Sequence, residues 1–399
     1  MRILVAWHDP AEAELLSLYL NLDESSAEIT SDLDDFWAKL GSGTPWDIVL
    51  LPTDRPDDST AMSVFQQVRK TRPDLPIVGA CHMETMFQLA GFLGQGLRAY
   101  VVRDQAGDFM FLLQATLQGV VEAVKAERER IISAKLREEI ESVRKLQESI
   151  MPRDLRSPDG YRICGRYESS QLQVIGGTPV VLAGGDYYDV FEAPNNETIV
   201  LLGDAAGHGM KACISIMAMH TLIRMILDRR YKDTAAFVES VNRHLCEQTM
   251  VGESEGFITM LFGLLKSQTN EFQWTSAGHP LPLLHRLDEN TVEPMGTMDD
   301  GGMPLGIISE CDYEWKSIEV PPRSRIILYT DGLEEAFPAE KQDTHGQFGQ
   351  AGIMRTVKEC RDKPLDETLD VLFNASNAFT EGAGRHDDTS VLLIERGDA

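Results

Sequence analysis

Positive charge is scarce in this chain of 399 residues. It carries 37 Lys and Arg side chains against 63 Asp and Glu, a formal net charge of −26 with histidine neutral. A surface of this sign repels the phosphates of nucleic acids and of anionic lipids. We therefore expect neither nucleic acid nor a membrane as a partner of this protein.

Cysteine pairs and long apolar runs are also missing. The six cysteines lie far apart, without a C-x-x-C pair or a Cys/His cluster at zinc spacing, which argues against a disulfide framework and a zinc site. No apolar run approaches the roughly 18 residues of a membrane helix. The first residues are typical of a buried strand and not of a signal peptide. The sequence therefore predicts a cytoplasmic protein with two or three domains.

Short apolar segments alternate with amphipathic helical segments over residues 1–119. This repeated pattern of strand and helix predicts a doubly wound α/β domain with a parallel sheet. Its ligand site is expected where the strands end, at Trp7–Asp9 and Pro52–Asp54. The predicted strands are Ile3–Trp7, Ile48–Leu51, Ile77–Ala80 and Ala99–Val102, and the predicted helices include Glu12–Leu20 and Ser63–Lys70.

The order of these segments resembles a response-regulator receiver domain, which has a flavodoxin-like fold. Pro52 holds the position of the family's phosphorylated aspartate, and proline cannot accept a phosphoryl group. The family's acidic pair is reduced to Asp9, while Cys81 and Arg103 stand at its Ser/Thr and lysine positions. The resemblance implies a degenerate receiver, an input or dimerisation module without a phosphoacceptor. The alternative, phosphorylation of Asp54, is disfavoured because a shifted acceptor would miss the metal that the acidic pair holds.

A long helix is predicted from Gly119 to Ile150, because this segment has no further Gly or Pro and is dense in Glu, Lys and Arg. It forms a linker over residues 120–151. Two interpretations fit its pattern equally well: a short parallel coiled coil between two copies of the chain, or one amphipathic helix that packs on its own domains. Glu139 interrupts the coiled-coil seam, whose positions are Ile132, Leu136, Val143, Leu146 and Ile150.

Four acidic turns distinguish residues 152–399, where many short strands and a few long helices predict an α+β domain. Aspartates that lie beside glycine at strand ends can point into a shared cleft. Carboxylates without thiolate or imidazole partners select hard ions such as Mg²⁺ or Mn²⁺. Two such ions about 4 Å apart activate water for attack on phosphorus, which predicts a metal-dependent phosphohydrolase. The turns are Gly184–Asp189, Gly203–Gly209, Tyr329–Gly332 and His386–Thr389.

These turns occur in order with further motifs, and together they resemble the SpoIIE/RsbU branch of the PPM (type 2C) serine/threonine protein phosphatases. The resemblance covers roughly residues 145–396 and implies an α-β-β-α sandwich for the domain at residues 152–399. The further motifs are Leu146–Pro152, Phe257–Gly263, Ser276–Pro280, Pro304–Gly306 and Gln347–Gly349.

The resemblance implies a site with two Mn²⁺ or Mg²⁺ ions. Asp186, from the family's G-G-D motif, would bind the second ion. Asp204, from the G-D-x-x-G-H-G motif, would bridge both ions, and the main-chain carbonyl of Ala205 would assist on the second. Asp331 of the T-D-G motif and Asp387 of the final D-D pair would complete the first. Asp204 and Asp331 are the predicted catalytic residues.

Three further side chains are expected around these ligands, and one of them, Asp388, is the less favoured alternative to Asp387 as the ligand. Asp388 matches the second aspartate of the D-D pair, and Asp189 matches the second of the G-G-D-x-x-D pattern, where it would support the turn. His208 would act as a general acid or, as we favour, shape its loop. A phosphate-binding arginine is not assigned, although Arg166 is a candidate.

The sequence therefore predicts a metal-dependent phosphatase whose N-terminal domain regulates it. The resemblance implies that the substrate is a phosphorylated STAS-type anti-anti-sigma factor antagonist. The interrupted heptad pattern of the linker predicts a homodimer. Two alternatives remain. The first is a non-catalytic regulatory scaffold, which the four aspartates argue against. The second is a phosphorylation-switched response regulator with phosphatase output, which Pro52 argues against.

Overall fold

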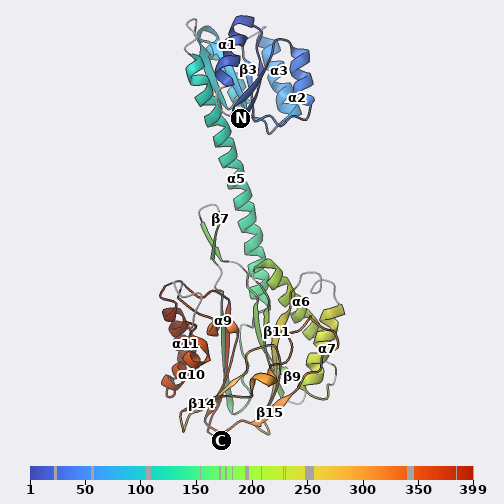
Figure 1. The fold of residues 1–399 in the computed structure, drawn as a ribbon, viewed down its shortest axis with the longest axis vertical. Coiled ribbons are helices and arrows are strands. Elements are labelled where there is room, and N and C mark those ends of the chain that lie inside the picture. The colour runs from blue at the N-terminus through green and yellow to red at the C-terminus, as the bar shows by residue number, and fades with distance from the viewer. Residues whose placement is uncertain are drawn as a thin grey trace. The chain divides into compact units, whose positions relative to one another are not determined.

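The chain divides into two compact units, Met1–Ser133 and Ala134–Ala399, in a computed structural model (Figure 1). Each unit is described by itself. The structure describes residues 1–21, 25–54, 58–104, 109–152, 154–169, 172–175, 178–181, 183–193, 197–207, 209–227, 229, 231–247, 256–338, 346–382 and 384–398.

The first unit is a five-stranded parallel sheet of order β2-β1-β3-β4-β5, which confirms the doubly wound, flavodoxin-like prediction. The predicted strands omit β2. Its exposed residues alternate with partly buried ones at the edge of the sheet, so its sequence shows no apolar run. The strands are β1 (Arg2–Ala6), β2 (Ser26–Thr30), β3 (Ile48–Pro52), β4 (Ile77–His82) and β5 (Ala99–Arg103).

Two apolar cores lie on the two faces of this sheet. Phe36, Phe65 and Phe92 belong to one core, and Trp7, Leu16 and Leu113 belong to the other. Because successive strand residues alternate between the faces, β1 contributes Leu4 to the first core and Ile3 to the second. The helices are α1 (Pro10–Leu20), α2 (Leu33–Gly41), α3 (Asp58–Thr71), η1 (Met83–Gln88), α4 (Leu89–Gly94) and α5 (Phe109–Ile150).

Helix α5 is a single helix of 42 residues, and it begins at Phe109, earlier than the predicted Gly119. Its first turns pack on the sheet of the first unit through Phe109, Leu113 and Leu117, so the last helix of the α/β domain and the linker are continuous. Three of the predicted seam residues are exposed: Ile132 by 67%, Leu136 by 47% and Leu146 by 57%. Ile150, the last seam residue, packs on the core of the second unit.

The second unit contains two five-stranded antiparallel sheets that pack face to face. One has the order β15-β12-β11-β10-β9 and the other β14-β13-β16-β17-β6. A two-stranded sheet, β7 (Leu172–Ile175) and β8 (Thr178–Val181), is separate. The strands are β6 (Tyr161–Glu168), β9 (Asp186–Ala193), β10 (Glu197–Ala205), β11 (Ile258–Lys266), β12 (Glu271–Ala277), β13 (Leu283–Arg286), β14 (Thr291–Pro294), β15 (Lys316–Glu319), β16 (Ser324–Tyr329) and β17 (Thr389–Arg396).

Helices cover the outer faces of both sheets, so the predicted α-β-β-α sandwich is confirmed (Figure 1). Helix α6 (Met210–Ile226) is apolar nearly all round, and its Cys213, Ile216 and Met219 are fully buried. None of the helices in the described ranges has the length and apolar character needed to cross a membrane. The helices are α6 (Met210–Ile226), α7 (Thr234–Glu247), η3 (Met298–Gly301), α9 (Asp331–Glu334), α10 (Gly349–Glu359) and α11 (Leu365–Phe379).

Candidate metal centre

Asp186 and Asp204 lie directly opposite each other on neighbouring strands. Asp186 is the first residue of β9, Asp204 is the penultimate residue of β10, and the antiparallel register pairs the two. Directly opposed residues have Cβ atoms about 4.5–5.5 Å apart. Val200 and Leu202, which alternate with Asp204 along β10, lie in the core between the two sheets. Both carboxylates are therefore at one end of the sandwich, on its inner face.

Asp331 comes from the other sheet, at the first turn of α9 immediately after β16. Thr330, which precedes it, is fully buried and donates a hydrogen bond from its hydroxyl to Asp186 Oδ2 (2.6 Å). The same hydroxyl accepts from the main-chain N–H of Ser390 (2.8 Å), at the start of β17. A single threonine thus fixes the T-D-G turn, the carboxylate of the G-G-D motif and the strand after the D-D pair relative to one another.

The final D-D pair approaches the same place from β17. Asp388 is buried, and its Oδ2 accepts a hydrogen bond from the main-chain N–H of Gly185 (2.8 Å). Asp387 is partly exposed, and its Oδ1 accepts from the N–H of Asp388 (2.8 Å). Asp388 therefore holds the G-G-D turn in place.

Three glycines permit this close approach. A Cβ on Gly184 would lie 2.0 Å from Asp388 Oδ2, and one on Gly332 would lie 1.9 Å from the main-chain oxygen of Asp388. A Cβ on Gly185 would lie 2.8 Å from the main-chain oxygen of Ala205, the carbonyl predicted to assist on a metal. The glycines of the G-G-D and T-D-G motifs are thus required for space, at places where backbone and carboxylate meet.

The carboxylates raise one another's pKa. Burial and then Asp331, Asp387 and Asp388 raise the pKa of Asp204 to about 8. Burial, together with the charges of Asp204 and Asp388, raises the pKa of Asp186 well above its usual value. Burial and the charge of a nearby glutamate raise the pKa of Asp331 to about 6. Because ionised carboxylates in such a cluster repel one another, a cation bound among them would stabilise their ionised forms.

Glu335 is the glutamate beside Asp331, and the motifs did not identify it. It is at the C-terminal end of α9, where its N–H donates to the main-chain oxygen of Asp331 (2.8 Å). Burial and the charge of Asp387 raise the pKa of Glu335. Its spacing of four residues from Asp331, one helical turn, is the signal that would have found it.

The chemistry of the donors fits a hard divalent ion. Asp186, Asp204 and Asp331 offer carboxylate oxygens, and no ion pair involving them is present in the described ranges. As these side chains stand, the described residues contain no group of three or more His, Cys, Asp or Glu arranged to hold a metal ion. The assignment of Asp186, Asp204, Ala205, Asp331 and Asp387 as ligands therefore stays a prediction.

Gln147, near the end of α5, holds the turn that carries Asp186. It is 2% exposed, and its Oε1 accepts from the N–H of Gly184 (2.8 Å). Its Nε2 donates to the main-chain oxygens of Gly184 (3.2 Å) and Asp186 (3.3 Å). The amide thus satisfies both ends of the G-G-D turn. Gln147 belongs to the motif Leu146–Pro152, from which no role for its side chain was predicted.

Asp189 faces away from the carboxylate cluster, toward α6. Its Oδ2 accepts a hydrogen bond from the hydroxyl of Tyr187 (2.7 Å) and pairs with Arg224 of α6. The same hydroxyl is 2.6 Å from Nδ1 of His220, also on α6. Asp189 therefore ties β9 to α6 and does not touch the other aspartates.

Two other predicted residues are placed less directly. His208 lies outside the described residues. Arg166, the candidate for binding phosphate, is on β6, where it pairs with Asp370 and Glu168 and lies over the ring of Phe373. Arg166 is therefore paired with carboxylates on the outer side of the sheet, near α11, and not with the aspartate cluster.

The C-terminal edge of the first unit holds the residues compared with a receiver. Pro52 is the last residue of β3, and Arg103 pairs with Glu12 at the end of β5. Asp54 Oδ2 accepts from the N–H of His82 (3.0 Å) and from the hydroxyl of Thr85 (3.1 Å), and it is 2.6 Å from His82 Nδ1. An acceptor engaged in this way is poorly placed to be phosphorylated.

Comparisons with known proteins identify the family of this chain. A family model described as Stage II sporulation protein E (SpoIIE) matches residues 194–397, about half of the chain. Protein IcfG of Synechocystis sp. is 22% identical over 282 residues, which cover 65% of this chain and 41% of IcfG. Phosphoserine phosphatase RsbP of Bacillus subtilis is 19% identical over 212 residues, which cover 53% of this chain and 49% of RsbP. The chain thus spans less than half the length of these relatives.

A solved structure shows the same fold. The SiaA PP2C domain of Pseudomonas aeruginosa matches with a TM-score of 0.53 at 16% sequence identity, covering 66% of this chain and 97% of that domain. At this identity the likeness establishes the fold alone. It identifies the second unit as a PP2C-like sandwich.

Proposed function

The chain belongs to the SpoIIE family, and from this premise we propose that it is a metal-dependent protein phosphatase that hydrolyses phosphoserine or phosphothreonine on a regulatory protein. The observation that carries the proposal is the convergence of acidic turns from both sheets at one end of the sandwich. Asp186 and Asp204 oppose each other across two strands, and the hydroxyl of Thr330 bonds the turn of Asp331 to Asp186. The name of RsbP, a phosphoserine phosphatase, supports the reaction type.

Two Mn²⁺ or Mg²⁺ ions, held by Asp186, Asp204, Asp331, Asp387 and the carbonyl of Ala205, would supply activation of water and neutralisation of phosphate charge. The chain's own residues set the position of these ligands. The Thr330 hydroxyl orients one carboxylate oxygen of Asp186, and Asp388 fixes the turn before it through Gly185. Ligands positioned in advance by such neighbours need little rearrangement when a metal binds.

The test is hydrolysis of p-nitrophenyl phosphate by the full chain with Mn²⁺, with EDTA, and with the Asp204→Asn variant. We expect turnover that requires the metal and is lost in the variant. Asp362→Asn is the matched control, because that carboxylate is 92% exposed and far from the cluster in sequence. Absence of turnover at saturating Mn²⁺ would favour the alternative of a non-catalytic scaffold.

The substrate we propose is a phosphorylated STAS-type antagonist of a partner-switching pathway. Support comes from the family to which the chain belongs and from the resemblance of its motifs to the SpoIIE/RsbU branch. The measurement is release of phosphate from a phosphoserine STAS protein, compared with a phosphoserine peptide of the same local sequence. Equal rates on both would contradict recognition of a folded partner.

We also propose that the chain is a homodimer and that the first unit is a degenerate receiver that regulates it. Exposed Ile132, Leu136 and Leu146 on α5 support association of two copies, which analytical ultracentrifugation would detect. Replacing all three by serine should yield monomers. Incubation with acetyl phosphate should leave the first unit unphosphorylated, because Pro52 stands at the acceptor position. Acid-labile phosphate on the chain would revive the phosphorylation-switched alternative.

A further inference from the structure

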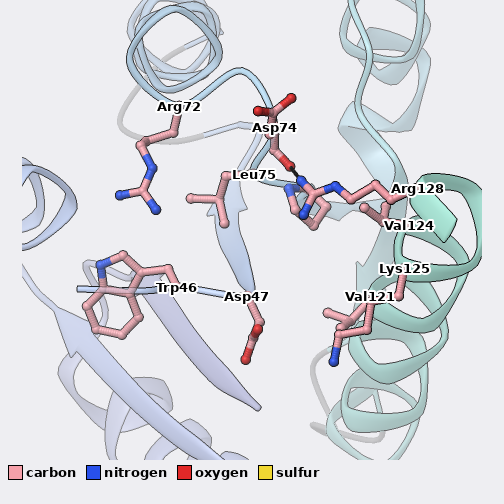
Figure 2. Close-up of a pocket in the computed structure, with 10 residues that line it drawn as sticks. Trp46, Asp47, Arg72, Asp74, Leu75, Val121, Val124, Lys125 and Arg128 are labelled. Carbon is pink, nitrogen blue, oxygen red and sulfur yellow. Dashed lines mark hydrogen bonds between the residues drawn. The ribbon is translucent and has the colours of Figure 1, made fainter. Parts of the chain in front are cut away.

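A cavity of about 250 Å³ lies in the first unit, at the sheet edge where β3 and β4 begin. This is the edge opposite the one compared with a receiver site. Figure 2 shows Trp46 and Arg72 on one side of the cavity and side chains of α5 on the other. Its lining is Trp46, Asp47, Arg72, Asp74, Leu75, Pro76, Val121, Val124, Lys125 and Arg128.

Three cationic side chains line this cavity in a chain whose net charge is −26. Lys125 has no hydrogen-bond or ion-pair partner among the described residues. Arg72 makes one long hydrogen bond, from Nη1 to the main-chain oxygen of Leu40 (3.4 Å). Arg128 donates only to the main-chain oxygen of Asp74. None of the three is paired with a carboxylate, so most of their donors are available to a ligand.

The two acidic residues of the lining offset these charges only in part, two against three. Asp47 already accepts a hydrogen bond from the main-chain N–H of Arg2 through Oδ2 (2.7 Å). The carboxylate of Asp74 points away from Trp46 and Lys125 in Figure 2. A neighbouring cavity of about 180 Å³ shares Asp74 and Arg128 and adds Arg69, Arg98 and Glu127, which extends the surface with a small excess of positive charge.

The rest of the lining is apolar. Trp46 is 7% exposed, and its indole N–H donates to the main-chain oxygen of Lys39 (3.1 Å), so the ring offers the cavity an apolar surface. Leu75 and Val121 are also buried beside it. A ligand in this place therefore meets apolar walls together with cationic groups.

We propose that this cavity binds a small organic anion. Its carboxylate or phosphoryl head contacts Arg72, Lys125 and Arg128, and its apolar body packs on Trp46 and Leu75. The planar fork of donors on arginine matches either head group. Because Lys125 and Arg128 belong to α5 while Arg72 precedes β4, the bound anion fastens the helix to the sheet edge. This proposal does not depend on phosphatase activity.

The test is isothermal titration calorimetry of the full chain in low-salt buffer with EDTA, using benzoate, phenylphosphonate and benzamide as probes. We expect one molecule of an anionic probe to bind per chain, and the stronger of the two anions identifies the preferred head. Benzamide, which has nearly the same shape as benzoate and no charge, should bind about tenfold more weakly or not at all.

Variants separate this site from general attraction of anions. Lys125→Gln and Arg72→Gln should each weaken binding about tenfold, while Lys135→Gln, an exposed lysine of α5 outside the cavity, should change it less than about twofold. Circular dichroism checks that each variant is folded. The proposal is overturned if neither anion binds at about 10 mM, if benzamide binds as well as benzoate, or if both cavity variants bind as the unaltered chain does.

Discussion

Gln147 is the residue whose replacement tests most directly how the candidate metal centre is held. Its side-chain amide accepts from the N–H of Gly184 and donates to the main-chain oxygens of Gly184 and Asp186. Gln147→Ala removes all of these bonds at once. Because Gln147 is 2% exposed, water does not readily replace the lost partner.

The size of the effect follows from these contacts. A buried polar group left without its partner costs about 1–3 kcal/mol. Only the hydrogen bond from the main-chain N–H of Gly184 to Gln147 is short (2.8 Å). The hydrogen bonds from Gln147 to the two main-chain oxygens are 3.2 and 3.3 Å long. We therefore expect a total cost of about 3 kcal/mol, shared between global stability and the order of the turn that carries Asp186. A cost of about 1.4 kcal/mol in ordering the turn corresponds to tenfold weaker metal binding.

The assay is p-nitrophenyl phosphate hydrolysis as a function of Mn²⁺ concentration, with thermal unfolding measured in parallel. Gln147→Ala should raise the Mn²⁺ concentration for half-maximal activity about 10- to 100-fold, the range typical of residues that orient metal ligands. Activity should recover at saturating Mn²⁺. The control is Glu148→Gln, the next residue of the helix, whose exposed side chain pairs only with Arg144.

Two results would refute this reasoning. If the Mn²⁺ requirement and the thermal midpoint of Gln147→Ala both match those of the unaltered chain, the side-chain amide stabilises neither the fold nor the turn that carries Asp186. If the control Glu148→Gln shows the same loss as Gln147→Ala, the effect belongs to the helix surface and not to the turn.

Three further predictions rest on single residues. Gly332→Ala should abolish metal-dependent turnover, because its Cβ would lie 1.9 Å from the main-chain oxygen of Asp388, whereas Gly301→Ala, where a Cβ meets nothing within 4 Å, should retain it. Arg325→Met removes a buried cation that pairs with a carboxylate and donates to two main-chain carbonyls, and it should lower the unfolding free energy in urea by about 3–5 kcal/mol; a loss under about 1 kcal/mol would contradict this. Burial alone would raise the pKa of Asp54, but the hydrogen bonds from His82 and Thr85 hold this pKa below its usual value. The ionised carboxylate of Asp54 therefore stabilises the fold above about pH 4, and this stabilisation is lost as the pH falls below that value. Asp54→Asn should therefore be less stable than the unaltered chain near pH 7, and urea titrations at decreasing pH should show the difference disappear.

The sequence predicted the parts of the fold that follow from strong local patterns. Apolar runs such as β3 and Ile326–Tyr329 of β16 predicted the parallel sheet and an α+β domain, whereas the α-β-β-α sandwich was implied by the resemblance. Strand β2 was missed because half of it faces solvent, and the early start of α5 was missed because its first turns read as part of the α/β domain. Local sequence pattern therefore does not identify an edge strand that is half exposed. It also does not locate the start of a helix that continues from the α/β domain into the linker.

The candidate site was predicted as a set of turns, but not its supporting contacts. Asp186 and Asp204 meet because both are at strand ends of one antiparallel pair, as their motifs suggested. Thr330 belongs to the T-D-G motif, but the motif does not predict its hydrogen bond to Asp186. Glu335 belongs to no motif, and Gln147 contacts a turn 37 positions away along the chain. Contacts of that kind depend on how the strands and α5 pack, which no local spacing encodes.

The pairing of Asp186 with Asp204 makes the candidate site sensitive to an insertion or deletion within β10. Along β10, residues alternate between the interior of the sandwich and the side facing α6, where Leu201 packs. Deleting one residue before Asp204 would move it to the position of Gly203, where an added Cβ lies 2.5 Å from Met219 of α6, so the carboxylate would face an apolar helix. A substitution elsewhere in β10 leaves this register unchanged, whereas one insertion or deletion would remove Asp204 from the candidate site.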